Sequence, residues 1–288
     1  LDVPVAYRIW PELGALQDQV PVVRVMIEAL PGASVTVAGK PVSLTPEGQG
    51  NAKIDVTEAI AGLSRDTKTL EKEIPYTVAT QGRAPESGKL SVRVGIAPLW
   101  LESPGNRMTT EAATFMLAGR TVKGGGLTVA GRAISVGADG AFAQLMNIST
   151  VGATEVSLRA SAPSLAPRIA TITVKRVASL AAEGKDLEAQ TKTTYADVLG
   201  KGEDVAQTPV VWRGEVVQSS TQGHQTIAVV EVTTGCAKRP CRARVVWPGG
   251  SALATGDKVL FGGRVTGLVT LGDAKLPDVE AELLVKAP

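Results

Sequence analysis

The chain has 288 residues, of which 44% are hydrophobic and only 3% aromatic, so its cores must consist mainly of Val, Ala, Leu and Ile. The formal net charge is +2 without a long basic run, so strong binding of polyanions is not implied. No apolar stretch approaches the ~18 residues that a membrane span requires. The chain begins at Leu1 without a signal-peptide pattern, so we expect a processed protein or the soluble part of a longer one.

Short alternating runs of Val and Thr, separated by 31 glycines and 17 prolines, predict an all-β protein with many turns. An internal repeat organises the N-terminal part. The stretch "SVTVAGKPVSL" (34–44) aligns with "GLTVAGRAISV" (126–136) at an offset of 92 residues, about the length of one β-sandwich domain. Each copy reads as two short strands around a tight Ala-Gly turn in which Gly takes positive φ. We therefore predict one sandwich over 1–101 and a second over 102–178.

The two copies diverge after this hairpin. In the first copy, the polar stretch 57–73 is compatible with a short helix or an extended loop. The second copy continues with an Asp-Gly turn, a strand that opens at Phe142, and two further alternating strands within 153–177. This arrangement resembles the bacterial immunoglobulin-like modules of secreted and cell-surface proteins, including the B domain of glucodextranase. The matching segments are Gly126 to Val136, Asp139 to Phe142 and Glu155 to Val174. The resemblance spans about 115–177 and implies a fold, with almost nothing about function.

The pattern changes again after the second copy. Apolar residues between Leu180 and Leu199 recur at imperfect helical intervals, which we interpret as a linker (179–207) with one short helix at "TTYADVL" (193–199). Five β-patterned runs follow and predict a small Greek-key barrel over 208–288. The runs are 209–220, 225–234, 241–248, 256–271 and 278–286.

The C-terminal region resembles the OB-fold domain of bacterial extracytoplasmic lipoproteins. In that family a short helix precedes the first strand, and a "GDKV" strand with a following "VTG" precedes a last strand that ends in "EA". The matching residues are Tyr195, Gly214, Val216, Gly256, Asp257, Lys258, Val259, Gly263, Val265, Thr266, Gly267, Pro277, Glu280 and Ala281. The resemblance spans 193–285 and implies an OB-like barrel, but it transfers no ligand-binding residue. The chain lacks the lipobox of that family.

Cys236 and Cys241 are the only cysteines, and they flank four residues between two β-patterned runs. Residues paired across a hairpin have Cα atoms about 4.5–5.5 Å apart, within the range of a disulfide. Free thiols and a metal site are the alternatives, but zinc needs four ligands and the chain offers two thiols and one imidazole, His224. The spacing also differs from the Cys-x-x-Cys of a thioredoxin-type pair. We predict a disulfide, which implies an oxidising compartment.

Catalytic, cofactor-binding and metal-binding motifs are not found. The stretch "GRAPESGKL" (82–90) lacks the spacing of a phosphate loop and its Ser or Thr. His224 lies in a polar turn, and the chain has no G-x-S-x-G elbow, so we interpret it as a solvated loop residue.

The barrel carries a candidate binding face of basic residues. Alternation places Arg242 and Arg244 on one face of their strand, although a solvated face explains this equally well. Trp212 and Trp247 lie in valine-rich strands, where packing in the core is the commoner fate of a tryptophan. The members of the candidate face are Arg213, Lys238, Arg239, Arg242 and Arg244.

The predicted fold is all-β, with two Ig-like β-sandwiches in tandem and a C-terminal five-stranded OB-like barrel preceded by a short helix. Such a chain is rich in scaffold and poor in convergent polar groups. We therefore predict a non-catalytic cell-envelope protein, without cofactor, that spaces or docks protein or glycan partners. The alternative is an accessory binding region of a larger secreted carbohydrate-active enzyme. Nucleic acid is disfavoured, the expected location is the periplasm or cell surface, and membrane attachment would need an anchor absent from this chain.

Overall fold

The computed structural model describes residues 6–236 and 240–286, and these residues form mostly β-structure. They comprise twenty strands, two α-helices and three 3-10 helices, so the all-β prediction is confirmed. The chain divides into two compact units. The first consists of the residues up to Leu99 together with 121–140 and 158–170, and the second of 100–120, 141–157 and the residues from Thr171 onward.

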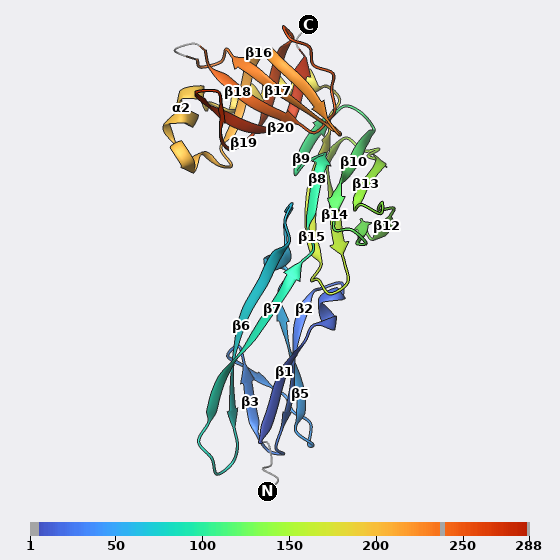
Figure 1. Cartoon of the computed structure of the whole chain (residues 1–288), viewed down its shortest axis with the longest axis vertical. Coiled ribbons are helices and arrows are strands. Elements are labelled where there is room, and N and C mark those ends of the chain that lie inside the picture. Colours follow the sequence, from blue (N-terminus) through green and yellow to red (C-terminus); the bar gives the residue numbers. More distant parts are fainter. Residues whose placement is uncertain (1–5, 237–239, 287–288) are drawn as a thin grey trace. The chain divides into compact units, whose positions relative to one another are not determined.

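Seven strands form the first sandwich, in two sheets with the orders β1-β2-β5 and β4-β3-β6-β7 (Figure 1). Alternation produces the layers: Val23, Val25 and Ile27 of β2 are buried in the core, whereas the residues between them are half-exposed. The strands are β1 (Tyr7–Glu12), β2 (Val22–Ala29), β3 (Ser34–Val37), β4 (Lys40–Val42), β5 (Gln49–Asp55), β6 (Lys68–Ala79) and β7 (Glu86–Ile96). Two 3-10 helices, η1 (Gly14–Gln17) and η2 (Glu58–Ile60), lie in the connections, so the polar stretch 57–73 contains one helical turn and the start of β6.

Eight strands form the second sandwich, with sheet orders β13-β10-β8 and β12-β11-β14-β15-β9. Both sandwiches have the small sheet and the larger sheet of an immunoglobulin-like fold. The strands are β8 (Leu99–Ser103), β9 (Arg107–Thr110), β10 (Thr114–Thr121), β11 (Gly126–Val129), β12 (Arg132–Ile134), β13 (Ala141–Asn147), β14 (Gly152–Ser161) and β15 (Arg168–Arg176).

The internal repeat extends further than the sequence comparison indicated. Four consecutive strands of the first sandwich, β2 to β5, begin and end 92 residues before the strands β10 to β13 of the second. The match includes Gly48 and Gly140, which both have positive φ and whose carbonyl groups accept hydrogen bonds from Ala29 and Thr121. The repeat is therefore a repeat of structure, and equivalent positions in the two copies can be compared directly.

The predicted Ala-Gly turns are present in both copies. Gly39 has a φ of 74° and Gly131 a φ of 78°, which confirms the prediction. The preceding Ala38 and Ala130 also have positive φ, at 50° and 46°. Positive φ at both central residues is the signature of a type I′ turn, whose twist matches that of the flanking strands.

The connection between β14 and β15 belongs to the first compact unit and hydrogen-bonds to the first sandwich. The backbone N–H of Ala166 donates to the carbonyl of Gly95, and the N–H of Ala97 donates to the carbonyl of Ala166. The N–H of Gly62 donates to the carbonyl of Ile169. This connection (residues 162–167) and the start of β15 are therefore held by backbone bonds of the kind that joins strands in a sheet.

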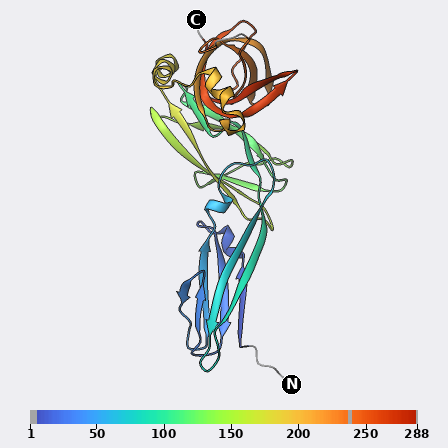
Figure 2. The same cartoon turned by 90° about the vertical axis from the view of Figure 1, so that its left-hand side faces the viewer.

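The C-terminal strands form a closed barrel of order β16-β17-β18-β20-β19, which Figure 2 shows nearly end-on. Four of the five strand pairs are antiparallel, and β18 runs parallel to β20. The interior is apolar, with Trp212 and Phe261 fully buried. The predicted five-stranded barrel preceded by a short helix is confirmed. Its strands are β16 (Pro209–Gln222), β17 (Gln225–Val232), β18 (Arg242–Trp247), β19 (Lys258–Leu271) and β20 (Ala274–Lys286).

The region 179–207 contains two α-helices where we predicted one. The predicted helix is α2 (Tyr195–Gly200), which begins with a capping box between Thr194 and Asp197. The additional helix is α1 (Leu180–Gln190), which is capped by Ser179 and which the sequence analysis did not predict. The 3-10 helix η3 (Gly202–Val205) follows α2. No helix among the described residues is long and apolar enough to cross a membrane.

Candidate functional site

The candidate basic face lies on the outside of the barrel. Arg213 is an exposed residue of β16, and Arg242 and Arg244 occupy alternate positions of β18, as predicted. The residues between and beside them, Ala243 and Val245, are buried inside the barrel. The remaining two members of the predicted face, Lys238 and Arg239, lie outside the described residues.

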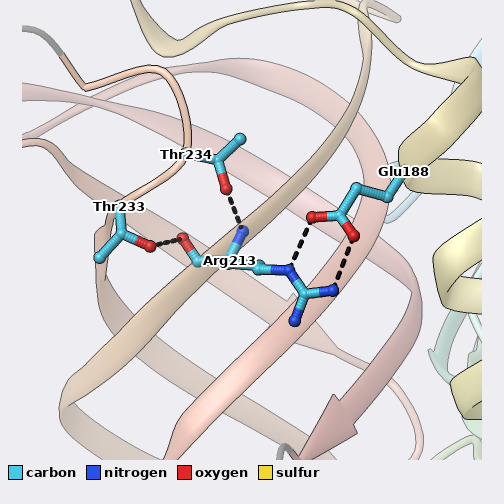
Figure 3. Close-up of polar contacts among 4 residues, drawn as sticks. All are labelled: Glu188, Arg213, Thr233 and Thr234. Carbon is cyan, nitrogen blue, oxygen red and sulfur yellow. Dashed lines mark hydrogen bonds and ion pairs between the residues drawn. The ribbon is translucent and has the colours of Figure 1, made fainter.

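Arg213 is engaged on both its side chain and its backbone (Figure 3). Its Nε and Nη2 atoms donate to the two carboxylate oxygens of Glu188 at 2.7 Å each, a bidentate pair. Its N–H donates to Oγ1 of Thr234, and its carbonyl accepts from Oγ1 of Thr233. The hydrogen bonds from Arg213 lower the pKa of Glu188, and those to Glu188 raise the pKa of Arg213. Arg213 therefore joins the barrel to α1 rather than facing solvent alone.

Arg244 is also paired. Its Nη1 lies 2.8 and 2.9 Å from the two carboxylate oxygens of Asp278, which stands opposite it in the parallel register of β18 and β20. Both side chains are half-buried. The positive charge of Arg244 is thus balanced by a neighbouring strand.

Arg242 is the described member of the face whose side chain is left without an ion pair among the described residues. It is exposed, and its carbonyl accepts a hydrogen bond from the hydroxyl of Tyr195 at 2.7 Å, so its backbone is fixed by α2. The binding role of the face stays a prediction, and among the described residues it now depends chiefly on Arg242.

The two cysteines form the predicted disulfide, with a Cα–Cα distance of 5.9 Å. The hairpin around it is longer than expected, because β17 ends at Val232 and β18 begins at Arg242. The N–H of Val232 donates to the carbonyl of Cys241 at 2.7 Å, which closes the base of the loop. The disulfide therefore constrains a loop of the barrel and lies next to Arg242 in sequence.

His224 is half-buried in the turn between β16 and β17, where its backbone N–H donates to Oε2 of Glu102. The described residues contain no group of three or more His, Cys, Asp or Glu that could hold a metal ion. The contact with Glu102 is made by the backbone of this turn, and His224 is less exposed than the predicted solvated loop residue.

The aromatic residues of the barrel region are all used in the interior. Trp212 and Trp247 are buried, as expected for core residues, and their indole N–H groups donate to the carbonyl of Thr193 and to Oγ of Ser251. The remaining two aromatic residues from 193 onward, Tyr195 and Phe261, are also buried and contact Trp212. Proteins that bind single-stranded nucleic acid stack bases on exposed rings, and the described barrel offers no such ring.

Residues from all five barrel strands line a groove of 280 Å³, and nothing in the sequence indicated it. Its apolar floor is formed by side chains from three strands, and the Arg244 side chain lines it with polar residues of β16 and β19. Leu271, one of the residues that line the groove, is 51% exposed. The apolar residues are Ile227, Ala228, Val229, Val269, Leu271 and Leu276.

A buried arginine in the first compact unit was also missed by the sequence analysis. Arg168 is only 1% exposed, and its Nε donates to the carbonyl of Ala97 at 2.7 Å while Nη1 donates to the carbonyl of Gly62. Its Nη2 has no partner among the described residues, and burial lowers the pKa of the guanidinium. The arginine follows Pro167 at the start of a strand, a pattern that carries no sign of burial.

Comparison with known proteins gives weak structural similarities only. No family model and no curated protein matches the chain. One similar structure is that of the fibronectin(III)-like modules of CbhA from Clostridium thermocellum, with 10% identity over 59% of this chain and 93% of that one and a TM-score of 0.21. A bacterial ice-binding adhesin is 11% identical over 98% of each chain with a TM-score of 0.21. SGBP-B of the mixed-linkage glucan utilization locus of Bacteroides ovatus is 13% identical over 96% of this chain and 70% of that one, with a TM-score of 0.20. Similarities this weak carry no argument, so the fold assignment rests on the strand orders.

Proposed function

We propose that the chain is a non-catalytic protein of the cell envelope that spaces or docks protein or glycan partners. The observation that carries this proposal is the hydrogen-bonded connection between β14 and β15. A hinge between tandem domains is a segment with few contacts. Here Gly62, Ala97 and Ala166 contribute backbone bonds, and Arg168 adds two more from its side chain. These bonds fix the connection to the first sandwich within the first compact unit, which supports a spacing role.

Native-state hydrogen exchange tests the spacing role. Amide protons exchange slowly when their hydrogen bonds open rarely. We expect the amides of Gly62, Ala97 and Ala166 to exchange as slowly as buried amides of β2 such as Val25. Exchange of these three amides at the rate of exposed loops would show that the connection opens freely, and the spacer role would fail.

The disulfide between Cys236 and Cys241 supports a location outside the cytosol, because cytosolic proteins are normally kept reduced. We propose the periplasm or cell surface. Titration of thiols in the unfolded, unreduced protein taken from its native host should find none. Two reactive thiols in that material would contradict the location.

The docking role is assigned to the barrel, through Arg242 and the groove beside Leu271. Arg242→Glu reverses an unpaired charge, and Leu271→Asp places a charge in the lining of the groove. If either surface binds a partner from envelope extracts, its variant should lose the partner at an unchanged melting temperature. Leu199→Asp, at another exposed leucine, is the control. Retention of every partner by both barrel variants would remove the barrel from the proposal.

The second candidate function is that of an accessory binding region of a carbohydrate-active enzyme. Its support is the resemblance of the second sandwich to modules of such enzymes. Sugar rings are commonly bound by exposed aromatic faces, and the described barrel keeps its aromatic residues inside. The test is binding to a panel of soluble polysaccharides. If the wild-type protein binds a polysaccharide and Leu271→Asp does not, this role would be favoured over the docking of proteins.

A further inference from the structure

We propose that β13 is a docking edge for a second copy of this chain, so that the protein pairs through two antiparallel β13 strands. The strand lies at the end of its sheet, next to β10 (Figure 1). An edge strand presents unpaired backbone groups, and proteins normally protect it with charges, prolines or short length. The seven residues Ala141–Asn147 include no charge and no proline.

The exposed side chains at the centre of β13 are uncharged, and one of them is a leucine. Ala143, Gln144 and Leu145 are exposed, and Leu145 is 59% exposed. Leu145 stands opposite Met116 of β10, so the two form an apolar pair on the outer face of the sheet. A long, neutral edge with an exposed leucine is the kind that pairs with another strand.

The first sandwich provides an internal comparison. Its strand β5 corresponds to β13 at the offset of 92 residues and is also the edge of its sheet. Lys53 stands where β13 has Leu145, and Asp55 stands where β13 has Asn147. The same edge is therefore protected by charge in the first copy and left neutral in the second, which points to a specific use of β13.

The backbone of β13 is oriented for pairing. In an antiparallel pair, residues that exchange hydrogen bonds alternate with residues that do not. Gly140 and Ile148, which flank β13, both hydrogen-bond to the backbone of the β10 segment. The alternation assigns the even-numbered residues of β13 to this ladder. The N–H and C=O groups of Ala143 and Leu145 consequently point toward the open side of the strand.

A second copy fits this edge by symmetry. If two β13 strands run antiparallel with Gln144 at the two-fold axis, Ala143 stands opposite Leu145 of the second copy, and the reverse pair forms on the other side of the axis. Both residues have outward backbone groups, so each pair exchanges two hydrogen bonds. The pairing places a small side chain against a large one and brings no like charges together.

Sedimentation equilibrium over a wide concentration range tests the proposal. We expect a reversible monomer–dimer equilibrium, and Leu145→Lys, which installs the residue of the first copy, should weaken it by about tenfold or more. Leu199→Lys at the exposed leucine of α2 is the matched control and should leave the dissociation constant unchanged. A monomeric wild-type protein at all concentrations, or equal association of wild type and Leu145→Lys, would overturn the proposal.

Cross-linking tests the register without relying on a loss of binding. A cysteine at 144 would face its own copy across the axis in a non-hydrogen-bonded pair, where Cα atoms are about 4.5 Å apart and a disulfide can form. Gln144→Cys should give a disulfide-linked dimer under mild oxidation. Ala52→Cys, the equivalent position of the first copy, should remain monomeric. Equal cross-linking of the two variants would contradict pairing through β13.

Discussion

Each of the two Ala-Gly turns holds one alanine, Ala38 or Ala130, in a strained backbone conformation with positive φ. A positive φ costs a residue with a Cβ atom roughly 1–2 kcal/mol, and Asn tolerates it better than Ala. Ala38→Asn and Ala130→Asn should therefore each raise the free energy of unfolding by about 0.5–1 kcal/mol, as measured by urea denaturation. Gly39→Ala, at a φ of 74°, should have the opposite effect. Equal stability of Ala38→Asn and wild type would mean that the turn relaxes in solution.

Arg168 should contribute more to the free energy of unfolding than any surface arginine does. Truncation leaves a cavity and removes the donors of the Ala97 and Gly62 carbonyls. Arg168→Ala should lower the free energy of unfolding by about 2–4 kcal/mol and accelerate exchange of the Ala166 amide. Arg159→Ala is a comparison, because Arg159 also donates to a carbonyl, that of Leu16, but is only half-buried. A loss below about 0.5 kcal/mol for Arg168→Ala would show that water replaces the side chain.

For single residues, the sequence correctly predicted the features that depend on local geometry. The Ala-Gly turns and the disulfide follow from residue types at fixed spacing, and the cores hold Trp212 and Trp247 as expected. The ion partners of Arg213 and Arg244 come from segments 25 and 34 residues away in the chain, and spacing carries no signal of such contacts.

Among the elements, α1 was missed because its packing depends on a glycine. A helix is recognised by apolar residues three or four positions apart, but the one buried residue of α1 is Gly184. A Cβ atom there would lie 2.6 Å from Cδ2 of Leu260. The close approach of helix and barrel is therefore set by the absence of a side chain, which no hydrophobic pattern shows.

The contact between Gly184 and Leu260 predicts that a Gly→Ala substitution in this helix is destabilising, the reverse of its usual effect. Gly→Ala in a helix normally stabilises by about 1 kcal/mol. Gly184→Ala should instead lower the free energy of unfolding by about 1–3 kcal/mol, because the methyl group overpacks the contact with Leu260. Gly200→Ala in α2, where nothing lies within 4 Å, should show the usual gain. Stabilisation by both substitutions would mean that α1 is not seated on the barrel.

The pair of Arg213 and Glu188 should make the attachment of α1 depend on pH. Because its folded-state pKa is lowered, Glu188 contributes stability above its ordinary pKa, and this contribution is lost as the pH falls through the lowered value. Glu188→Gln should thus be less stable than wild type at pH 7, and the difference should shrink in acid. Thermal unfolding at several pH values measures this. A constant deficit for Glu188→Gln at every pH would exclude the ion pair as its cause.

For the molecule as a whole, the 92-residue repeat explains most of what could be predicted. Alternation and turns identified both sandwiches and the barrel, because those features are local and repeated. The equivalence of Gly48 and Gly140 could not be recognised from the sequence, because the residues around them differ. The two positions share only their backbone conformation, with positive φ. The division into domains at 1–101, 102–178, 179–207 and 208–288 stays a prediction. The barrel groove was not predictable, because it arises where distant hairpins approach.

The duplicated sandwiches have diverged where they meet solvent. The strands β2 to β5 have the same lengths as β10 to β13, yet Lys53 and Leu145 occupy the same edge position. A spacing role needs only the core that the two sandwiches share. A docking role depends on the exposed residues in which the two sandwiches differ. We therefore expect a fixed connection between β14 and β15, and recognition of partners by the barrel and by β13.

The central claim, that this connection is fixed to the first sandwich, is tested most directly by a distance between spin labels. Lys53→Cys and Ser164→Cys place labels at exposed positions of β5 and of the connection, both in the first compact unit. Pulsed electron spin resonance on the doubly labelled protein, with the native disulfide intact, should give one narrow distance distribution that broadens in Arg168→Ala. A distribution that is already broad in the wild-type background would contradict the account.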